Sequence, residues 1–123
     1  MADDEGLIRR IFVEIIESVF PEIEVETARD GLDCIQKCKK KRFDLLFLNM
    51  VMPHATGADV LEFLKKSSST MPVWVMSGSY FEAEGDGKIK ALGGRGIIPK
   101  PPGIDQIIEV VEAELGIRAG VFH

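Results

Sequence analysis

Two kinds of hydrophobic pattern alternate along the chain: segments with helical periodicity and short apolar segments typical of strands. Apolar residues recur every three or four positions, as on one face of an amphipathic helix, over about residues 6–20, 31–41, 58–66, 84–92 and 104–115. Short apolar segments lie near residues 23–28, 45–48, 73–76 and 96–98. The first of these alternates like a half-buried strand, whereas the other three are nearly continuous, which is typical of strands covered on both faces.

Strands that alternate with helices predict an α/β fold with a doubly wound parallel sheet and right-handed crossovers. In such folds polar sites gather at the carboxyl ends of the strands. Asn49, Ser77 and Lys100 each follow or end one of the apolar segments, and the acidic run Asp3-Asp4-Glu5 lies close to the amino terminus. We therefore expect two carboxylates, an amide, a hydroxyl and an ammonium to meet at one edge of the sheet.

Composition narrows the functional classes. The chain has 123 residues and a net charge of −5, which fits one domain over 1–116 with a tail at 117–123 and disfavours nucleic acid or anionic membranes as partners. We expect no membrane span and no signal peptide. The two cysteines, Cys34 and Cys38, fit a reducing compartment and so favour the cytoplasm.

The polar positions occur within a longer ordered set of motifs, which are Asp3-Asp4-Glu5, residues 43–53, Thr56-Gly57, residues 73–78 and Pro99-Lys100-Pro101. Together they resemble the CheY-like receiver domain of response regulators in bacterial two-component signalling, from residue 3 to about residue 115. The resemblance implies a flavodoxin-like sheet with strand order 2-1-3-4-5. It also implies that Asp3 and Asp4 bind magnesium, that position 49 accepts a phosphoryl group from a histidine kinase, and that Ser77 and Lys100 contact that group.

Position 49 departs from this pattern because it is asparagine, whereas the family carries aspartate. An amide is a poor nucleophile and a poor metal ligand, so we expect no acyl phosphate, weak or absent magnesium, no cofactor and no enzymatic activity. The chain would then act through protein–protein contacts alone. The alternatives are an ordinary phosphoacceptor receiver with an engineered aspartate-to-asparagine change, and a flavin or nucleotide binder on the same fold. No glycine-rich phosphate loop supports the latter.

The amino terminus departs as well, since only Met1 and Ala2 precede the acidic pair, where the family has a central strand. An empty central position would leave backbone groups of two strands without partners. Three ways to fill it are residues outside this sequence, a rearrangement, or a segment of a partner chain. For a chain complete from Met1, we expect exchange within a symmetric dimer, with Ile117–Phe122 or the first helix as candidates.

The resemblance also implies a partner surface on the helix near 84–92, the strand 96–98 and the last helix. On that face we place Ile89, Ile97, Ile104 and Ile108, and the expected partner is a signalling protein such as a histidine kinase or an output protein. Tyr80 and Phe81 are further candidates. Ile97 stands where the family often has an aromatic switch residue. We also expect Lys100 to reach the acidic pair and the Lys100–Pro101 bond to be cis.

Overall fold

The computed structural model describes residues 1–78 and 83–119. Tyr80 and Phe81 lie outside these ranges. In chain order the elements are α1 (Gly6–Val19), α2 (Gly31–Lys40), β1 (Leu46–Asn49), α3 (Gly57–Lys66), β2 (Val73–Ser77), α4 (Ala83–Ala91), β3 (Gly96–Pro99) and α5 (Ile104–Leu115). The predicted helices are all present, with ends that differ by one residue at most from the sequence-based bounds.

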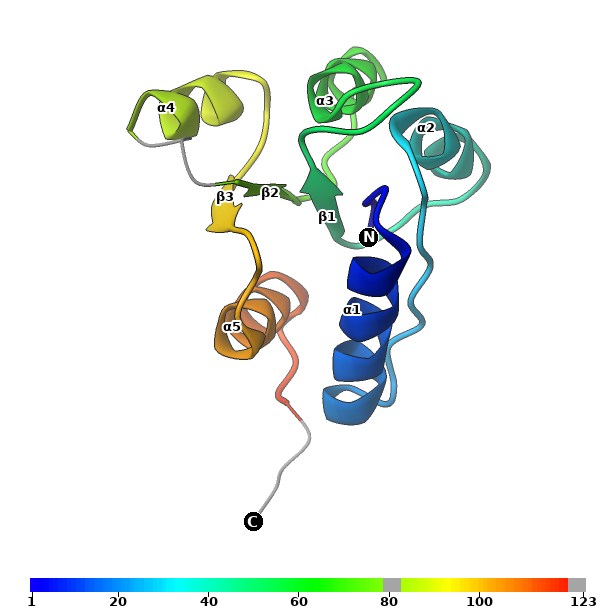
Figure 1. The fold of residues 1–123 in the computed structure, drawn as a ribbon, viewed down its shortest axis with the longest axis vertical. Helices are drawn as coiled ribbons and strands as arrows, with labels where there is room; N and C mark the ends of the chain where they lie inside the picture. The colour runs from blue at the N-terminus through cyan, green and yellow to red at the C-terminus, as the bar shows by residue number, and fades with distance from the viewer. Residues whose placement is uncertain (79–82, 120–123) are drawn as a thin grey trace.

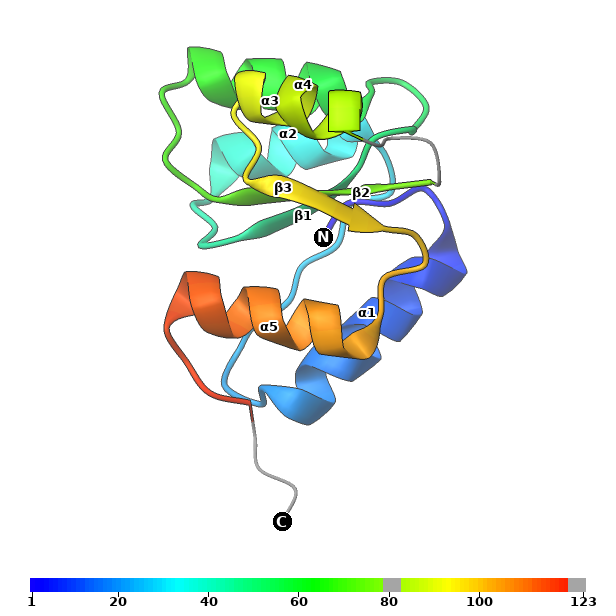
Figure 2. The same ribbon diagram turned by 90° about the vertical axis from the view of Figure 1, so that its left-hand side faces the viewer.

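The three strands form a parallel sheet in the order β1-β2-β3. Helices cover both of its faces, with α1 and α5 on one side and α2, α3 and α4 on the other (Figures 1 and 2). Each face has its own buried core: Leu46, Leu48 and Val75 point to the side of α2 and α3, whereas Phe47 and Met76 point to the side of α1 and α5. The predicted fold class is therefore confirmed.

Local sequence signals fix two of the helix starts beside the site. The Asp30 side chain accepts a 2.7 Å hydrogen bond from the backbone N–H of Asp33 and so caps α2. Thr56 and Asp59 form a reciprocal capping box at the start of α3. Between them, Gly57 packs so closely on the end of β1 that a Cβ there would lie 2.8 Å from the Asn49 carbonyl oxygen. The start of α3 is thereby pressed against the loop after β1.

The amino-terminal residues lie in the central position of the sheet. Ala2 forms parallel bridges with Leu48 on one side and Ala28 on the other. Its N–H donates to the Phe47 carbonyl at 2.8 Å and its carbonyl accepts from Asn49 at 2.9 Å, while the N–H of Asp3 donates to Ala28 at 3.0 Å. The order of the family's sheet is thus preserved at this end, although only one residue of the central strand is paired on both sides.

The predicted strand at residues 23–28 is not formed, apart from the single bridge at Ala28. The alternation of apolar and polar side chains still matches their burial, because Ile23 and Val25 pack against the core on the α1 side. A strand needs a neighbour for its backbone groups, and within residues 1–78 and 83–119 no strand pairs with residues 23–26. The alternation of side chains therefore correctly predicted the buried positions but not the hydrogen-bonded element.

Candidate functional site

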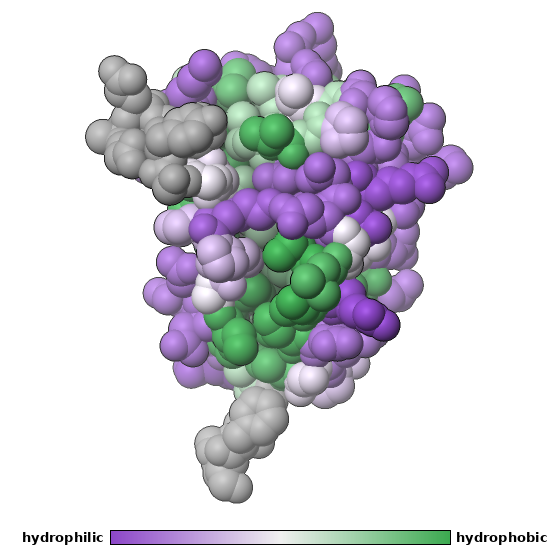
Figure 3. Space-filling view, viewed as in Figure 1, coloured by the Kyte–Doolittle hydropathy of each residue, from purple (hydrophilic) through white to green (hydrophobic). Residues whose placement is uncertain are grey.

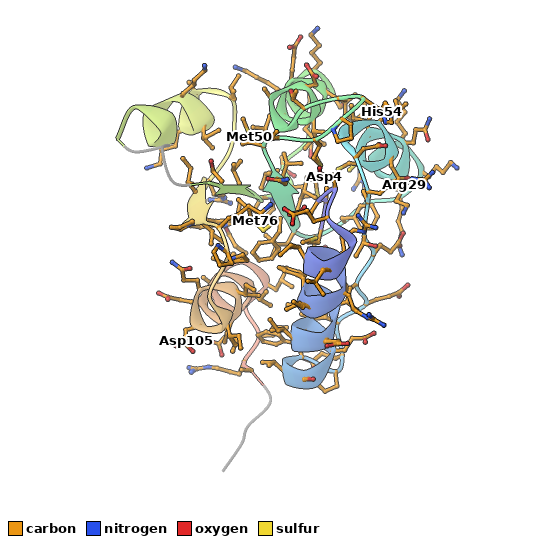
Figure 4. All side chains as sticks on the ribbon, viewed as in Figure 1. Asp4, Arg29, Met50, His54, Met76 and Asp105 are labelled. Atoms are coloured by element: carbon orange, nitrogen blue, oxygen red, sulfur yellow. The ribbon has the colours of Figure 1, made fainter. Side chains whose placement is uncertain are left out.

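The predicted polar positions do meet at the carboxyl ends of the strands. Asn49 ends β1, Ser77 ends β2, and Lys100 follows β3 directly. Asp3 and Asp4 enter this edge from the central position, between the end of β1 and the start of α1, where Figure 4 shows Asp4. Parallel pairing explains the convergence, because it aligns the ends of all strands at the same edge.

Asp3 and Lys100 form the most buried ion pair of this edge. Asp3 is fully buried, and its Oδ2 lies 2.9 Å from Lys100 Nζ, whose side chain is 17% exposed. The ammonium approaches Oδ2 as a charge, without the alignment of a hydrogen bond. The other oxygen, Oδ1, accepts from the Glu5 N–H at 2.9 Å. The expectation that Lys100 reaches the acidic pair is confirmed, and the Lys100–Pro101 bond is cis as predicted.

Asn49 is buried and uses its amide nitrogen within the site. Its Nδ2 donates to Asp4 Oδ1 at 3.2 Å and to the Val51 carbonyl at 2.9 Å. Both donors of the amide group are therefore engaged, one with the exposed carboxylate of Asp4 and one with the loop after β1. An aspartate in this position could donate neither bond and would place a second negative charge beside Asp4.

Ser77 lies at the same edge but its hydroxyl is turned to its own loop. The side chain is 3% exposed, and Oγ donates to the Gly78 carbonyl at 3.3 Å. The link between Ser77 and Lys100 runs through the backbone, since the N–H of Lys100 donates to the Ser77 carbonyl at 2.7 Å. The structure thus brings Asp3 to Lys100 and Asp4 to Asn49, and it leaves the Ser77 hydroxyl outside both contacts.

The residues present fit a magnesium ion poorly. Magnesium prefers several oxygen ligands, with carboxylates supplying the negative charge. Here the Asp3 carboxylate faces the Lys100 ammonium and the Asp4 carboxylate faces the Asn49 amide nitrogen. Within the described ranges, no three acidic, histidine or cysteine side chains are arranged to hold a metal ion. The positive charge that a cation would bring is already supplied by lysine.

The structure places three further side chains around this edge, beyond the five that the sequence assigned to it. Glu5 Oε1 lies 3.6 Å from Lys100 Nζ, and the acidic run at residues 3–5 could have indicated it. Arg9 Nη1 donates to the Asp3 carbonyl at 2.8 Å, a contact with no signal in the sequence. His54 Nδ1 lies 2.9 Å from Asp30 Oδ2, and Figure 4 shows His54 on the side of α2. The Asp33 N–H first, and His54 second, hold the pKa of Asp30 below its usual value.

The predicted partner surface is only partly exposed. Ile104 is 55% exposed and Ile97 and Ile108 are half-buried, but Ile89 is 1% exposed, so its assignment to a surface is wrong. Ile89 is buried because it faces the core between α4 and the sheet. Two residues of α1, Leu7 and Ile11, are 66% and 44% exposed. Figure 3 shows that an apolar patch runs over α1 and α5, beneath a polar band.

None of the helices in the described parts of the chain has the length and hydrophobicity that a membrane crossing requires.

Comparison with known proteins places this fold and site in a family. Residues 1–112 match the response regulator receiver domain. The chain is 39% identical over 105 residues to a protein-glutamate methylesterase/protein-glutamine glutaminase of Pyrococcus horikoshii, and the match covers 82% of the chain but 27% of that relative. It therefore spans about a quarter of the length of this relative. The polar-differentiation response regulator DivK of Brucella anthropi is 26% identical over 117 residues, which cover 94% of both proteins.

Solved structures of receiver-type proteins are also similar to this chain in fold. The receiver domain of NtrX from Brucella abortus is 26% identical, with a TM-score of 0.82 over 94% of this chain and 95% of that one. Chemotaxis protein CheY4 of Vibrio cholerae is 25% identical, with a TM-score of 0.80 over 92% of this chain and 93% of that one. The family match extends over nearly the whole chain, on the fold that the sequence motifs implied, and the chain therefore belongs to the response-regulator receiver domains of two-component signalling.

Proposed function

We propose that this receiver domain acts by protein–protein interaction and is not phosphorylated at position 49. The observation that carries the proposal is Asn49 itself, which is buried at the end of β1 with both amide donors engaged by Asp4 and Val51. Acyl phosphate formation needs a carboxylate oxygen as nucleophile. The amide has no such oxygen, and its nitrogen is held in two hydrogen bonds.

The contacts around Asn49 support a domain that functions without a bound phosphoryl group or magnesium ion. Lys100 is paired with Asp3, and the Ser77 hydroxyl is bonded to Gly78. Each group that the family uses to contact a phosphoryl oxygen thus has a partner within this chain. Magnesium is proposed to bind weakly or not at all, and the domain is proposed to have no enzymatic activity and no cofactor of its own.

Incubation with acetyl phosphate and magnesium is expected to leave the intact mass of the protein unchanged. The reason is the missing carboxylate nucleophile at position 49. A receiver domain that carries aspartate at this position serves as the positive control under identical conditions. A stoichiometric gain of one phosphate that maps to Asn49, or to an aspartate formed there by deamidation, would overturn the proposal.

The partner is proposed to be a signalling protein, either a histidine kinase or an output protein, and not nucleic acid or a membrane. The exposed apolar side chains of Ile104, Leu7 and Ile11 on α5 and α1 support a surface for such a partner, beside the half-buried Ile97 and Ile108. A homodimer and a cytoplasmic location stay predictions from the sequence. The alternative, an ordinary phosphoacceptor receiver with an engineered change, is distinguished by the genomic codon at position 49.

Binding to purified dimerisation domains of histidine kinases from the same genome tests this surface. We expect at least one of them to bind the unphosphorylated chain, and the Ile104→Glu variant to bind it about tenfold more weakly, since a charge in an apolar contact costs at least 1.4 kcal/mol. Leu32→Glu is the matched control, because Leu32 is 48% exposed on α2, away from this patch. If no kinase domain binds, a histidine kinase is not the partner, and if both variants weaken binding equally, this surface is not the docking site.

A further inference from the structure

A groove lies at the amino ends of β1 and β2, at the end of the sheet opposite the candidate site. It is a cavity of about 710 Å³ between the last turns of α2 and α3 and the loops that lead into these strands. In Figure 2 both loops lie at the end of the sheet away from the arrowheads. None of the residues that line this amino-end groove belongs to the candidate site or to the exposed apolar residues of α1 and α5.

Half-buried apolar side chains form the floor of the amino-end groove. They are Phe43, Phe63, Met71 and Pro72, and Leu64 is buried among them. Phe63 and Met71 also pack against the hydrophobic core on the side of α2 and α3. Because core contacts hold these side chains in place, a ligand can cover their exposed parts without first ordering the groove.

Cations dominate the charged side chains around this floor. Lys39, Lys41 and Arg42 line the groove with a single carboxylate, Asp44, and all four are exposed. Two glutamates pair with Lys41. Within residues 1–78 and 83–119, neither Lys39 nor Arg42 has an acidic partner, and the Lys39 Nζ lies 5.6 Å from the centre of the Phe63 ring. Two cations beside an apolar floor are therefore free to pair with an anionic ligand.

The helix dipole explains only part of this positive charge. Cations stabilise the last turn of a helix, and Lys37, Lys39 and Lys40 lie in the last turn of α2. Arg42 lies beyond the end of that helix. Residues 37–42 hold five of the 15 lysine and arginine residues of a chain whose net charge is −5. Such close cations repel one another, and an anionic ligand would relieve that repulsion.

We propose that the amino-end groove binds a short acidic segment of a partner protein, with one aromatic or large apolar side chain among the carboxylates. The apolar side chain would cover Phe63 and Met71, and the flanking carboxylates would pair with Lys39 and Arg42. Serine and threonine side chains at residues 67–70 line the groove from the loop after α3 and can donate hydrogen bonds to the segment. This second surface goes beyond the contact proposed for α1 and α5, and it does not depend on Asn49.

A short peptide suits this groove better than a nucleic acid does. The charged lining of the groove is net positive, but the chain as a whole carries a net charge of −5, so the surface around the groove is net negative. A DNA duplex carries one charge per about 1.7 Å of its length and would extend onto that repelling surface. An acidic segment of a few residues would contact the groove alone, which is why we commit to a peptide.

Fluorescence anisotropy with the full chain and a fluorescein-labelled peptide, Asp-Glu-Asp-Phe-Asp-Glu-Asp, tests the proposal. We expect saturable binding that weakens at least about threefold when sodium chloride is raised from about 0.05 M to about 0.5 M. Two control peptides separate the contributions: one has asparagine and glutamine in place of the acids, and the other has alanine in place of phenylalanine. Each should bind at least about tenfold more weakly, because each lacks one half of the match to the groove.

Charge reversal at the groove locates the binding site. Arg42→Glu should weaken binding of the acidic peptide at least about tenfold, whereas Arg10→Glu should change it by less than about twofold. Arg10→Glu is the matched control, since it makes the same change in net charge at an exposed position of α1. Ile104→Glu should leave peptide binding unchanged, which separates this groove from the surface on α1 and α5. In the parent chain, the amide chemical shifts of Phe63, Ser68 and Met71 should move most on titration with the peptide.

Four outcomes would overturn the proposal. Equal binding of the acidic and the neutral peptide means that the cations of the groove do not select the ligand. Equal weakening by Arg42→Glu and Arg10→Glu means that only the overall charge of the chain matters. Loss of peptide binding in Ile104→Glu places the peptide on α1 and α5. If single-stranded DNA binds as tightly as the peptide and depends equally on Arg42, the groove is a nucleic-acid site.

Discussion

Replacement of Lys100 by methionine is expected to lower the free energy of unfolding by about 3–5 kcal/mol, because it leaves a buried carboxylate without its cation. Asp3 is 0% exposed, and Lys100 Nζ lies 2.9 Å from its Oδ2. Glu5 carries the same sign of charge as Asp3, so it cannot replace the lysine. A domain of this size is stable by only about 5–15 kcal/mol, so the urea concentration at the midpoint of unfolding should be much lower for Lys100→Met than for the parent chain.

The double variant Asp3→Asn/Lys100→Met keeps this prediction testable even if the single variant fails to fold. Removal of both charges takes away the unpaired buried carboxylate, so the double variant should recover most of the loss. Lys66→Met is the surface control, because Lys66 is 76% exposed where it pairs with Glu62 at 2.9 Å, and it should change stability by less than about 1 kcal/mol. If Lys100→Met is as mild as Lys66→Met, the ion pair to Asp3 does not form.

A carboxylate at position 49 is expected to raise magnesium affinity at least about tenfold, since hard oxygen ligands with negative charge are what this ion requires. In Asn49→Asp, the new carboxylate would stand where the amide now donates to Asp4 Oδ1 at 3.2 Å. Repulsion between these two carboxylates, reduced because Asp4 is exposed, should lower stability by about 1–3 kcal/mol without the metal. Magnesium should restore that stability.

Calorimetric titration with magnesium chloride measures the affinity, and thermal unfolding with and without the ion measures the linked stability. Asn49→Ala is the matched control, because it removes the same two hydrogen bonds without adding a charge. It should bind magnesium no better than the parent chain. If Asn49→Asp also binds no better, the ends of the strands do not assemble into one acidic pocket.

The sequence alone was sufficient for the fold class and for most of the site. Helical periodicity and continuous apolar runs such as Leu45–Leu48 predicted the helices and the strands β1, β2 and β3, because these elements bury side chains in a regular pattern. Strand ends in a parallel sheet share one edge, so the positions of Asp3, Asn49 and Lys100 in the chain already predicted that they meet. The identity of residue 49 also indicated the lost chemistry, since an amide lacks the nucleophilic oxygen wherever it is placed.

Tertiary structure decided which partners each of these groups has. The acidic pair is divided, with Asp3 paired to Lys100 and Asp4 bonded to Asn49, and the hydroxyl of Ser77 joins neither. Such choices depend on differences of a few ångströms between side chains from four segments, which no local pattern encodes. Burial at the surface likewise depends on neighbours: Ile89 is covered by the sheet and Leu7 is not, although both are apolar residues of helices.

The central position of the sheet shows most clearly what the sequence could not predict. The sequence predicted that Met1-Ala2 was too short to be a strand, and it predicted a strand at residues 23–28 from alternation alone. In the structure, residues 23–28 form only the single bridge at Ala28, and a cavity lies between residues 22–27 and residues 43–47. A segment becomes a hydrogen-bonded strand only where a second strand lies beside it. Side-chain periodicity is a property of one segment and can be read from its sequence, whereas backbone pairing needs a neighbour that only the folded chain supplies.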